Sequence, residues 1–186
     1  MTFDEPTRHE MCLMGLTEAV GYEIRPVNGA QRLFQKGAST KAGAWTFSKL
    51  AHRVDRRLLA LTHGRTAVAT LVAGLPIITV TTTGAKSGLP RSLPLLGIPI
   101  EGDLALIGTN FGQSNTPGWV YNLEADPTGR VAYRNRDVGF IARRANPEET
   151  ETALTAAARV YPGYDKYRER ITGREVKVFV LAASEA

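Results

Sequence analysis

Three strand-like segments joined by tight turns limit the fold of this chain more than any other feature. Ile77 to Thr83 is rich in β-branched residues, and Pro90 to Ile100 and Leu104 to Thr109 also have the character of extended chain. Turn-forming residues separate them, at Gly84 to Gly88 and at Glu101 to Asp103. Parallel strands need connections of a dozen or more residues, so these strands are predicted to pair antiparallel.

The C-terminal half adds elements of both kinds. Pro117 suits the first turn of a short helix that runs to Leu123 and ends at Asp126-Pro127. Next comes a predicted hairpin, with strands at 130–134 and 138–143 around Asn135-Arg136-Asp137. It is followed by a helix that starts at Asn146-Pro147-Glu148-Glu149 and runs through 151–160, and by a last strand at 174–181. This order predicts an α+β fold, a small antiparallel barrel with helices packed on it.

The first 63 residues differ in character from the rest. Residues 1–40 mix proline, glycine, asparagine and charges without a sustained period, so we expect a loosely ordered arm with at most one short helix and no chemistry. Residues 41–63 are predicted to form an amphipathic helix with a basic side, which includes Arg53, Arg56 and Arg57. A single domain is therefore expected over residues 41–186.

Composition argues against several classes of protein. Cys12 is the only cysteine, so no disulfide can form within the chain, and a reducing, cytoplasmic location is expected. The N-terminus is acidic and polar, unlike a signal peptide. The most apolar stretch, 68–80, is broken by Gly74 and Pro76 and falls short of the about 20 residues that span a bilayer. The net charge of +5 attracts anions in general.

Motifs for metal or nucleophile chemistry are missing from the sequence. The histidines have no second ligand type at metal spacing, so no metal site is predicted; they are His9, His52 and His63. No G-x-S-x-G motif occurs, and Cys12 has no identifiable base partner. Hydrolysis by a metal or a nucleophile is therefore not expected.

One turn has the residues of an anion site. Lys86 and Arg91 are five residues apart, on either side of Gly88 and Pro90, between two predicted strands. Glycines let backbone amides approach an anion, and the two cations beside them would hold a phosphate. The alternative is a solvated hairpin turn with two incidental cations.

A longer set of motifs, in order along the chain, resembles one known family. The motifs are Thr81 to Arg91 with Pro94-Leu95, Gly108-Thr109-Asn110 with Gly112, Pro117 to Leu123, Asp126-Pro127, Tyr161 to Tyr167, and Arg174-Glu175. Together they resemble the deazaflavin-dependent nitroreductase family. The resemblance implies a split β-barrel, bound coenzyme F420, and reduction of quinones, nitroaromatics or activated enones.

The resemblance also assigns residues to the cofactor. Lys86 and Arg91, with Ser87 and Gly88 between them, match the positions that hold the cofactor phosphate and acidic glutamyl tail. The other implied cofactor-binding residues are Pro94, Leu95, Thr109, Asn110, Trp119 and Asn122. Asn110 stands where a lysine is frequent, which lowers the affinity expected for the tail, and Val120 stands where an aromatic residue is often found.

Three tyrosines are implied as walls of the acceptor site: Tyr161, Tyr164 and Tyr167. Tyr164 and Thr109 are the implied proton or hydrogen-bond donors to the reduced substrate. Without the resemblance, the helical spacing of the tyrosines favours a buried aromatic stripe, Trp119 and Leu123 would serve as core anchors, and Asn122 would serve as a hydrogen-bonding partner of the backbone. The sequence leaves these alternatives open.

The sequence thus predicts an enzyme that transfers a hydride from reduced F420 to a small electron-poor acceptor. An FMN-dependent split-barrel oxidoreductase is one alternative, because the FMN phosphate would also suit Lys86 and Arg91. Another is a non-catalytic basic module that binds nucleic acid or anionic membrane through its arginine-rich helix, although no nucleic-acid motif is present. At most peripheral membrane contact is expected, and the oligomeric state is left open.

Overall fold

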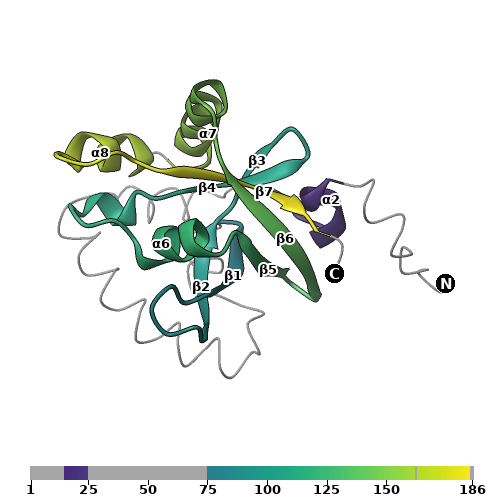
Figure 1. Ribbon diagram of the computed structural model, residues 1–186. Coiled ribbons are helices and arrows are strands. Elements are labelled where there is room, and N and C mark those ends of the chain that lie inside the picture. The colour runs from purple at the N-terminus through teal and green to yellow at the C-terminus, as the bar shows by residue number, and fades with distance from the viewer. Residues whose placement is uncertain (1–14, 25–74, 162, 185–186) are drawn as a thin grey trace.

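The computed structural model describes residues 15–24, 75–161 and 163–184 (Figure 1). The predicted basic helix at 41–63 and most of the predicted arm lie outside these residues, as do Cys12 and the three histidines. What is described is one antiparallel sheet with helices packed on it.

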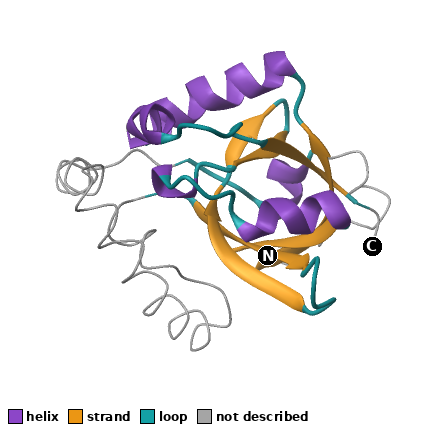
Figure 2. Ribbon diagram, turned by 60° about the vertical axis from the view of Figure 1, so that its left-hand side comes forward, coloured by secondary structure: helices purple, strands orange, loops and turns teal. Residues whose placement is uncertain are grey.

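Within the described residues, seven strands form a single sheet in which every neighbouring pair is antiparallel, as predicted. The strands are β1 (Ile77–Thr83), β2 (Pro90–Leu96), β3 (Ile98–Ile100), β4 (Asp103–Ile107), β5 (Thr128–Tyr133), β6 (Arg136–Arg144) and β7 (Val178–Ala183). Their order is β2-β1-β5-β6-β7-β4-β3. Because only Gly97 separates β2 from β3, the two ends of this order are tied together, and the sheet curls into a half-barrel (Figure 2).

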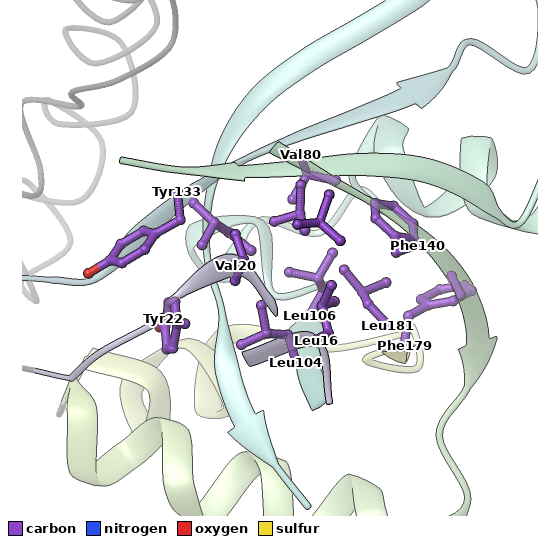
Figure 3. Packing of buried hydrophobic residues seen from close by; sticks show 14 of the residues in the cluster. Leu16, Val20, Tyr22, Val80, Leu104, Leu106, Tyr133, Phe140, Phe179 and Leu181 are labelled. Atoms are coloured by element: carbon purple, nitrogen blue, oxygen red, sulfur yellow. The ribbon is translucent and has the colours of Figure 1, made fainter. Parts of the chain in front are cut away.

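Strands β4 and β7 are buried on both faces, which divides the core in two. Leu104, Leu106, Phe179 and Leu181 belong to a first cluster, enclosed by the curled sheet (Figure 3). The residues that alternate with them belong to a second cluster on the opposite face; they are Ala105, Ile107, Val178 and Val180. Burying a large apolar side chain stabilises a fold by about 1.5–3 kcal/mol, so these two short strands hold much of the sheet together.

The helices cover both clusters. They are α2 (Leu16–Val20), the short turn η1 (Asn110–Gly112), α6 (Gly118–Ala125), α7 (Pro147–Val160) and α8 (Gly163–Arg170). Helices α2 and α6 bury apolar residues in the first cluster, whereas α7 and α8 lie on the second (Figure 1). The helix α8 was not part of the predicted element order, although the tyrosine spacing indicated a helical face.

Residues 15–24 differ from the loosely ordered arm that the sequence predicted. Leu16 and Val20 are buried in the first cluster, and the Tyr22 hydroxyl donates hydrogen bonds to the carbonyls of Pro76 (3.1 Å) and Gly97. A short segment can bury this much because four of its residues reach the core at once, Leu16, Ala19, Val20 and Tyr22. These residues therefore pack into the core of the domain that was expected over residues 41–186.

Two predicted boundaries also differ from the structure. The hairpin turn lies at 134–135, where Arg134 has a φ of 54°, and Arg136 already pairs with Tyr133 across the strands. The last strand begins at Val178 instead of Arg174, because the Arg174 guanidinium bonds to backbone carbonyls in a loop that has left the sheet. Neither interaction produces a recognisable pattern in the sequence.

Helix α7 begins with the predicted cap. The Asn146 side chain accepts a hydrogen bond from the Glu149 N–H, and the Glu149 carboxylate accepts one from the Asn146 N–H, both at 2.8 Å. Arg143 donates to both oxygens of the same carboxylate, at 2.8 and 2.5 Å. These hydrogen bonds, first that of Arg143 and then that of Asn146, lower the pKa of Glu149 to about 2.

We predict that Glu149→Gln lowers the melting temperature near neutral pH and that the difference disappears in acid. A carboxyl whose pKa is lowered by folding stabilises the protein above its unfolded pKa, 4.5 for Glu149, and loses this effect as the pH falls toward about 2. Thermal melts across this pH range measure it. Glu148→Gln, in the same first turn, is the matched control; a gap for Glu149→Gln that stays constant into acid would contradict the prediction.

Candidate functional site

The turn between β1 and β2 is closed by its own backbone. The Gly84 N–H donates to the Leu89 carbonyl at 2.9 Å, and the N–H groups of Ser87 and Gly88 both donate to the Gly84 carbonyl, at 3.1 and 2.8 Å. Gly88 has a φ of 64°, a left-handed conformation that glycine adopts without strain. A Cβ atom at Gly84 would lie 2.7 Å from Ser87 Oγ. Both glycines of the predicted anion-binding turn are therefore required by its shape.

Two cations flank this turn and have no acidic partner among the described residues. The side chains of Lys86 and Arg91 are exposed, and neither takes part in an ion pair there. One Arg91 nitrogen donates to Ser87 Oγ at 3.4 Å, which draws the guanidinium toward the turn. The space beside Gly88 is open, since a Cβ atom there would meet nothing within 4 Å. Positive charge and open space thus occur together at this turn, although the N–H groups of Ser87 and Gly88 already donate to the Gly84 carbonyl.

Asn122 connects helix α6 to the same turn. Its Oδ1 accepts a hydrogen bond from the Ala85 N–H at 3.0 Å, and its Nδ2 donates to Thr82 Oγ1, also at 3.0 Å. Thr82 is itself buried, with 2% of its surface exposed. Both ends of the amide are therefore engaged within the protein, as the alternative role of backbone partner predicted, and the amide fixes the turn to the helix.

The loop after β4 has an unusual backbone. Thr109 is buried, and the next three residues, Asn110, Phe111 and Gly112, have φ angles of 47°, 56° and 79°. A left-handed backbone costs a residue other than glycine about 1–2 kcal/mol, and asparagine tolerates it best. The Asn110 side chain donates to the Asn115 carbonyl at 3.1 Å. Two of the residues assigned to the cofactor thus stand on a strained loop.

Arg174 holds this loop, a role that the sequence analysis missed. Its guanidinium donates to the carbonyls of Gly108 (3.0 Å), Thr109 (3.1 Å) and Gln113 (3.1 Å). Burial lowers the pKa of this guanidinium. The only signal in the sequence was the place of Arg174 in the last of the family motifs, because no local pattern relates it to a loop 65 positions earlier.

The three tyrosines lie in the second core cluster. Tyr161, Tyr164 and Tyr167 are 6–7% exposed, and their ring centroids are 5.9–6.2 Å apart. The hydroxyl oxygens of Tyr161 and Tyr167 are 3.3 Å apart. Burial raises the pKa of all three phenols, so they remain protonated at neutral pH. This is the buried aromatic stripe that the spacing alone favoured.

The other residues assigned to the cofactor are Trp119 on α6 and Pro94 and Leu95 on β2. Trp119 is 4% exposed and packs edge-on against Phe179, with ring centroids 5.9 Å apart, so its indole is a core anchor of α6. Pro94 and Leu95 lie half-buried on β2, where Leu95 pairs with Ile78 and packs against the first cluster. None of the three carries a charge.

Helix α6 brings the predicted cofactor segments together (Figure 1). Asn122 ties it to the β1–β2 turn, and a Cβ atom at Gly108 would lie 3.2 Å from the Val120 side chain, so the same helix packs on the start of the β4 loop. The loop in turn contacts helix α8, because the ring centroids of Phe111 and Tyr167 are 6.2 Å apart. Segments distant in sequence therefore form one neighbourhood.

Two other kinds of site are not seen in the described part of the chain. No group of three or more histidine, cysteine, aspartate or glutamate side chains there could hold a metal ion. None of the helices there has the length and apolar character that crossing a bilayer requires.

Comparison with known proteins identifies the family. The model of the F420H(2)-dependent quinone reductase family matches residues 51–183. The chain belongs to this family. Over 110 residues it is 32% identical to the F420H(2)-dependent quinone reductase of Mycobacterium tuberculosis (strain ATCC 25618 / H37Rv), an alignment that covers 57% of this chain and 72% of the relative.

Solved structures agree with this assignment. An F420-H2 dependent reductase, FDR-A, is 34% identical with a TM-score of 0.52, over 57% of this chain and 93% of that one. A protein solved as a domain-swapped dimer is 30% identical with a TM-score of 0.54, over 72% and 98%. The predicted split β-barrel, the reductase activity and the cofactor F420 are thereby confirmed, in preference to FMN or a non-catalytic module.

We predict that Asn122→Ala weakens the binding of F420 by about tenfold. Two hydrogen bonds that fix the β1–β2 turn are lost, each worth about 0.5–1.5 kcal/mol. Titration of F420 fluorescence measures the affinity. Thr82→Val is the matched control: it removes the acceptor of Nδ2 and leaves the Ala85 hydrogen bond, so it should weaken binding less. Affinity equal to that of the parent in Asn122→Ala would show that the amide does not position the turn.

Proposed function

We propose that this reductase binds the phosphate and acidic tail of F420 at the β1–β2 turn and passes a hydride from the reduced cofactor to a small electron-poor acceptor. The observation that supports this proposal best is the turn itself, where Lys86 and Arg91 are exposed beside the open backbone of Gly88. An anion would gain charge-assisted hydrogen bonds from both cations without displacing an acidic residue of the described chain. Ser87, which orients Arg91, completes this part of the site.

The ring of the cofactor is proposed to lie between β2 and the loop after β4. Pro94 offers half-buried apolar surface on one side, while Leu95, on the opposite face of β2, packs behind it against the first cluster. Thr109 and Asn110 offer polar groups on the other side. Asn122 and Trp119 act through helix α6, the first by fixing the turn and the second by anchoring the helix in the core. This division separates the residues that touch the cofactor from those that hold its surroundings in place.

The chemistry needs little from the side chains. When bound, reduced F420 supplies a hydride, and the chain must present the acceptor at a near-attack distance of about 3–3.5 Å and exclude water. Negative charge then develops on an oxygen of the acceptor, and hydroxyl groups can stabilise it. We assign this to Tyr164 and Thr109. Because burial raises the pKa of Tyr164, its hydroxyl is protonated at neutral pH and can donate a hydrogen bond.

Quinones are the first class of acceptor to test, because the family is named for quinone reduction. Nitroaromatics and activated enones are electron-poor in the same way and are proposed as further acceptors. Binding of F420 compared with FMN, followed by anaerobic turnover with a quinone, a nitroimidazole and an enone lactone, tests the proposal. The cytoplasmic location, with at most peripheral membrane contact through residues 41–63, stays a prediction.

We predict that Lys86→Ala and Arg91→Ala each weaken F420 binding by about 1.5–3 kcal/mol, roughly 10- to 150-fold, and that the double variant nearly abolishes it. Fluorescence titration at two salt concentrations measures this, since exposed contacts weaken with salt. Arg134→Ala is the matched control: it removes an exposed arginine whose guanidinium pairs with Glu23. If both turn variants bind like the parent, the phosphate is held elsewhere.

We predict that Tyr164→Phe lowers kcat by about 10-fold or more and leaves the affinity for F420 unchanged, because only a donor to the developing charge is removed. The loss should be constant between about pH 6 and pH 9, since the phenol does not ionise there. Tyr161→Phe is the control: it removes another buried hydroxyl, which lies beside that of Tyr167. A stable Tyr164→Phe enzyme with parental kinetics would remove the Tyr164 hydroxyl from the mechanism.

A further inference from the structure

One arginine side chain spans the whole left-handed loop after β4. Arg174 Nη2 donates to the Thr109 carbonyl at 3.1 Å and to the Gln113 carbonyl at 3.1 Å, and Nη1 donates to the Gly108 carbonyl at 3.0 Å. Thr109 and Gln113 are the residues immediately before and after the three that have positive φ angles. The fork of the guanidinium therefore joins both ends of the loop across its strained middle.

The positive charge of Arg174 has no carboxylate partner among the described residues. Its two remaining hydrogen bonds, from Nε to the Gln113 carbonyl at 3.4 Å and from Nη1 to the Glu175 carbonyl at 3.3 Å, are again to the backbone. The Glu175 carboxylate is paired with Arg144 at 2.8 Å instead. The half-buried Arg174 guanidinium therefore bonds only to backbone carbonyls. These hydrogen bonds fix the guanidinium on the loop and also fix the conformation of the loop.

The opposite side of the loop is closed by α8. A Cβ atom at Gly112 would lie 3.3 Å from the backbone of Tyr167 and from the Arg170 side chain. The ring of Phe111 meets that of Tyr167 at 6.2 Å. The loop is therefore confined between Arg174 and α8, and without the arginine its nearest alternative is a relaxed, right-handed backbone at Asn110 and Phe111.

We propose that Arg174 is a positioning residue of the reductase, which locks the Asn110–Gly112 turn in its left-handed form and so sets where Thr109 and Asn110 stand toward F420. This inference rests on the proposed function, which places both residues at the cofactor. Arg174 itself touches neither cofactor nor acceptor. Its five N–H groups in a fixed fork suit a clamp on several carbonyls, which a lysine cannot reproduce.

The test compares Arg174→Met, Arg174→Lys and a control in the full chain. Arg136→Met is the matched control, because Arg136 also donates to two backbone carbonyls, those of Glu18 and Ala19, both at 3.2 Å, at the α2 end of the fold. Amide hydrogen exchange of the peptide that spans residues 108–115 reports on the loop without cofactor. Fluorescence titration reports on F420 binding, and melting temperatures report on general damage.

We expect faster exchange of residues 108–115 and roughly tenfold weaker F420 binding in Arg174→Met, with nearly the same result in Arg174→Lys, because misplacing a site loop by about an ångström has effects of this size or larger. Arg136→Met should change the melting temperature only. Full binding in Arg174→Lys would show that charge matters and the clamp does not. Unchanged exchange in Arg174→Met would also overturn the proposal.

A second variant tests the strain directly. Glycine adopts a positive φ freely, so in a Phe111→Gly background Arg174→Met should weaken F420 binding by only about threefold. An undiminished tenfold loss in that background would contradict the role of Arg174 in holding a strained turn. A parent protein that binds no F420 would refute the proposed function, while the exchange of residues 108–115 would still decide whether Arg174 clamps the loop.

Discussion

The burial of β4 and β7 on both faces is the constraint on which the rest of the structure depends. Leu104 and Leu106 alternate with Ala105 and Ile107, so each step along β4 buries a side chain in one of the two clusters. A shift of one residue in register would exchange the two sets and place leucines where alanine and isoleucine now fit. The end of β4 is thereby fixed, and with it the position of the loop that follows.

Helix α6 connects the first core cluster to the turn between β1 and β2 at the edge of the sheet. Trp119, Val120 and Leu123 are buried against the first cluster, so the helix cannot rotate without opening the core. Asn122 then stands on the half-buried side of the same helix and fixes the β1–β2 turn through hydrogen bonds. An exposed turn with two uncompensated cations thus takes its geometry from buried residues.

The antiparallel sheet, the capped helix α7 and the glycine turn could be predicted because each depends on residues that are near one another in sequence. The packing of Leu16 and Tyr22 could not, since a short buried segment within a polar region has no period of its own. The role of Arg174 depends on contacts with residues more than 60 positions away. The tyrosine spacing alone favoured a buried helical face, whereas the family resemblance favoured contact with the acceptor. Asn122 was named without its partners.

Asn110 shows how a departure from the family pattern can suit the local backbone. In the proposed site, a lysine at this position would add a cation beside the cofactor, but it would have to adopt the φ of 47° that the loop imposes. Asparagine tolerates this conformation better, and its amide also satisfies the Asn115 carbonyl at 3.1 Å. Asparagine in place of lysine thus removes one positive charge and adds a hydrogen bond within the loop. In the proposed site, the positive charge comes from Lys86 and Arg91, and the loop after β4 contributes a fixed shape that Asn110 and Arg174 hold together.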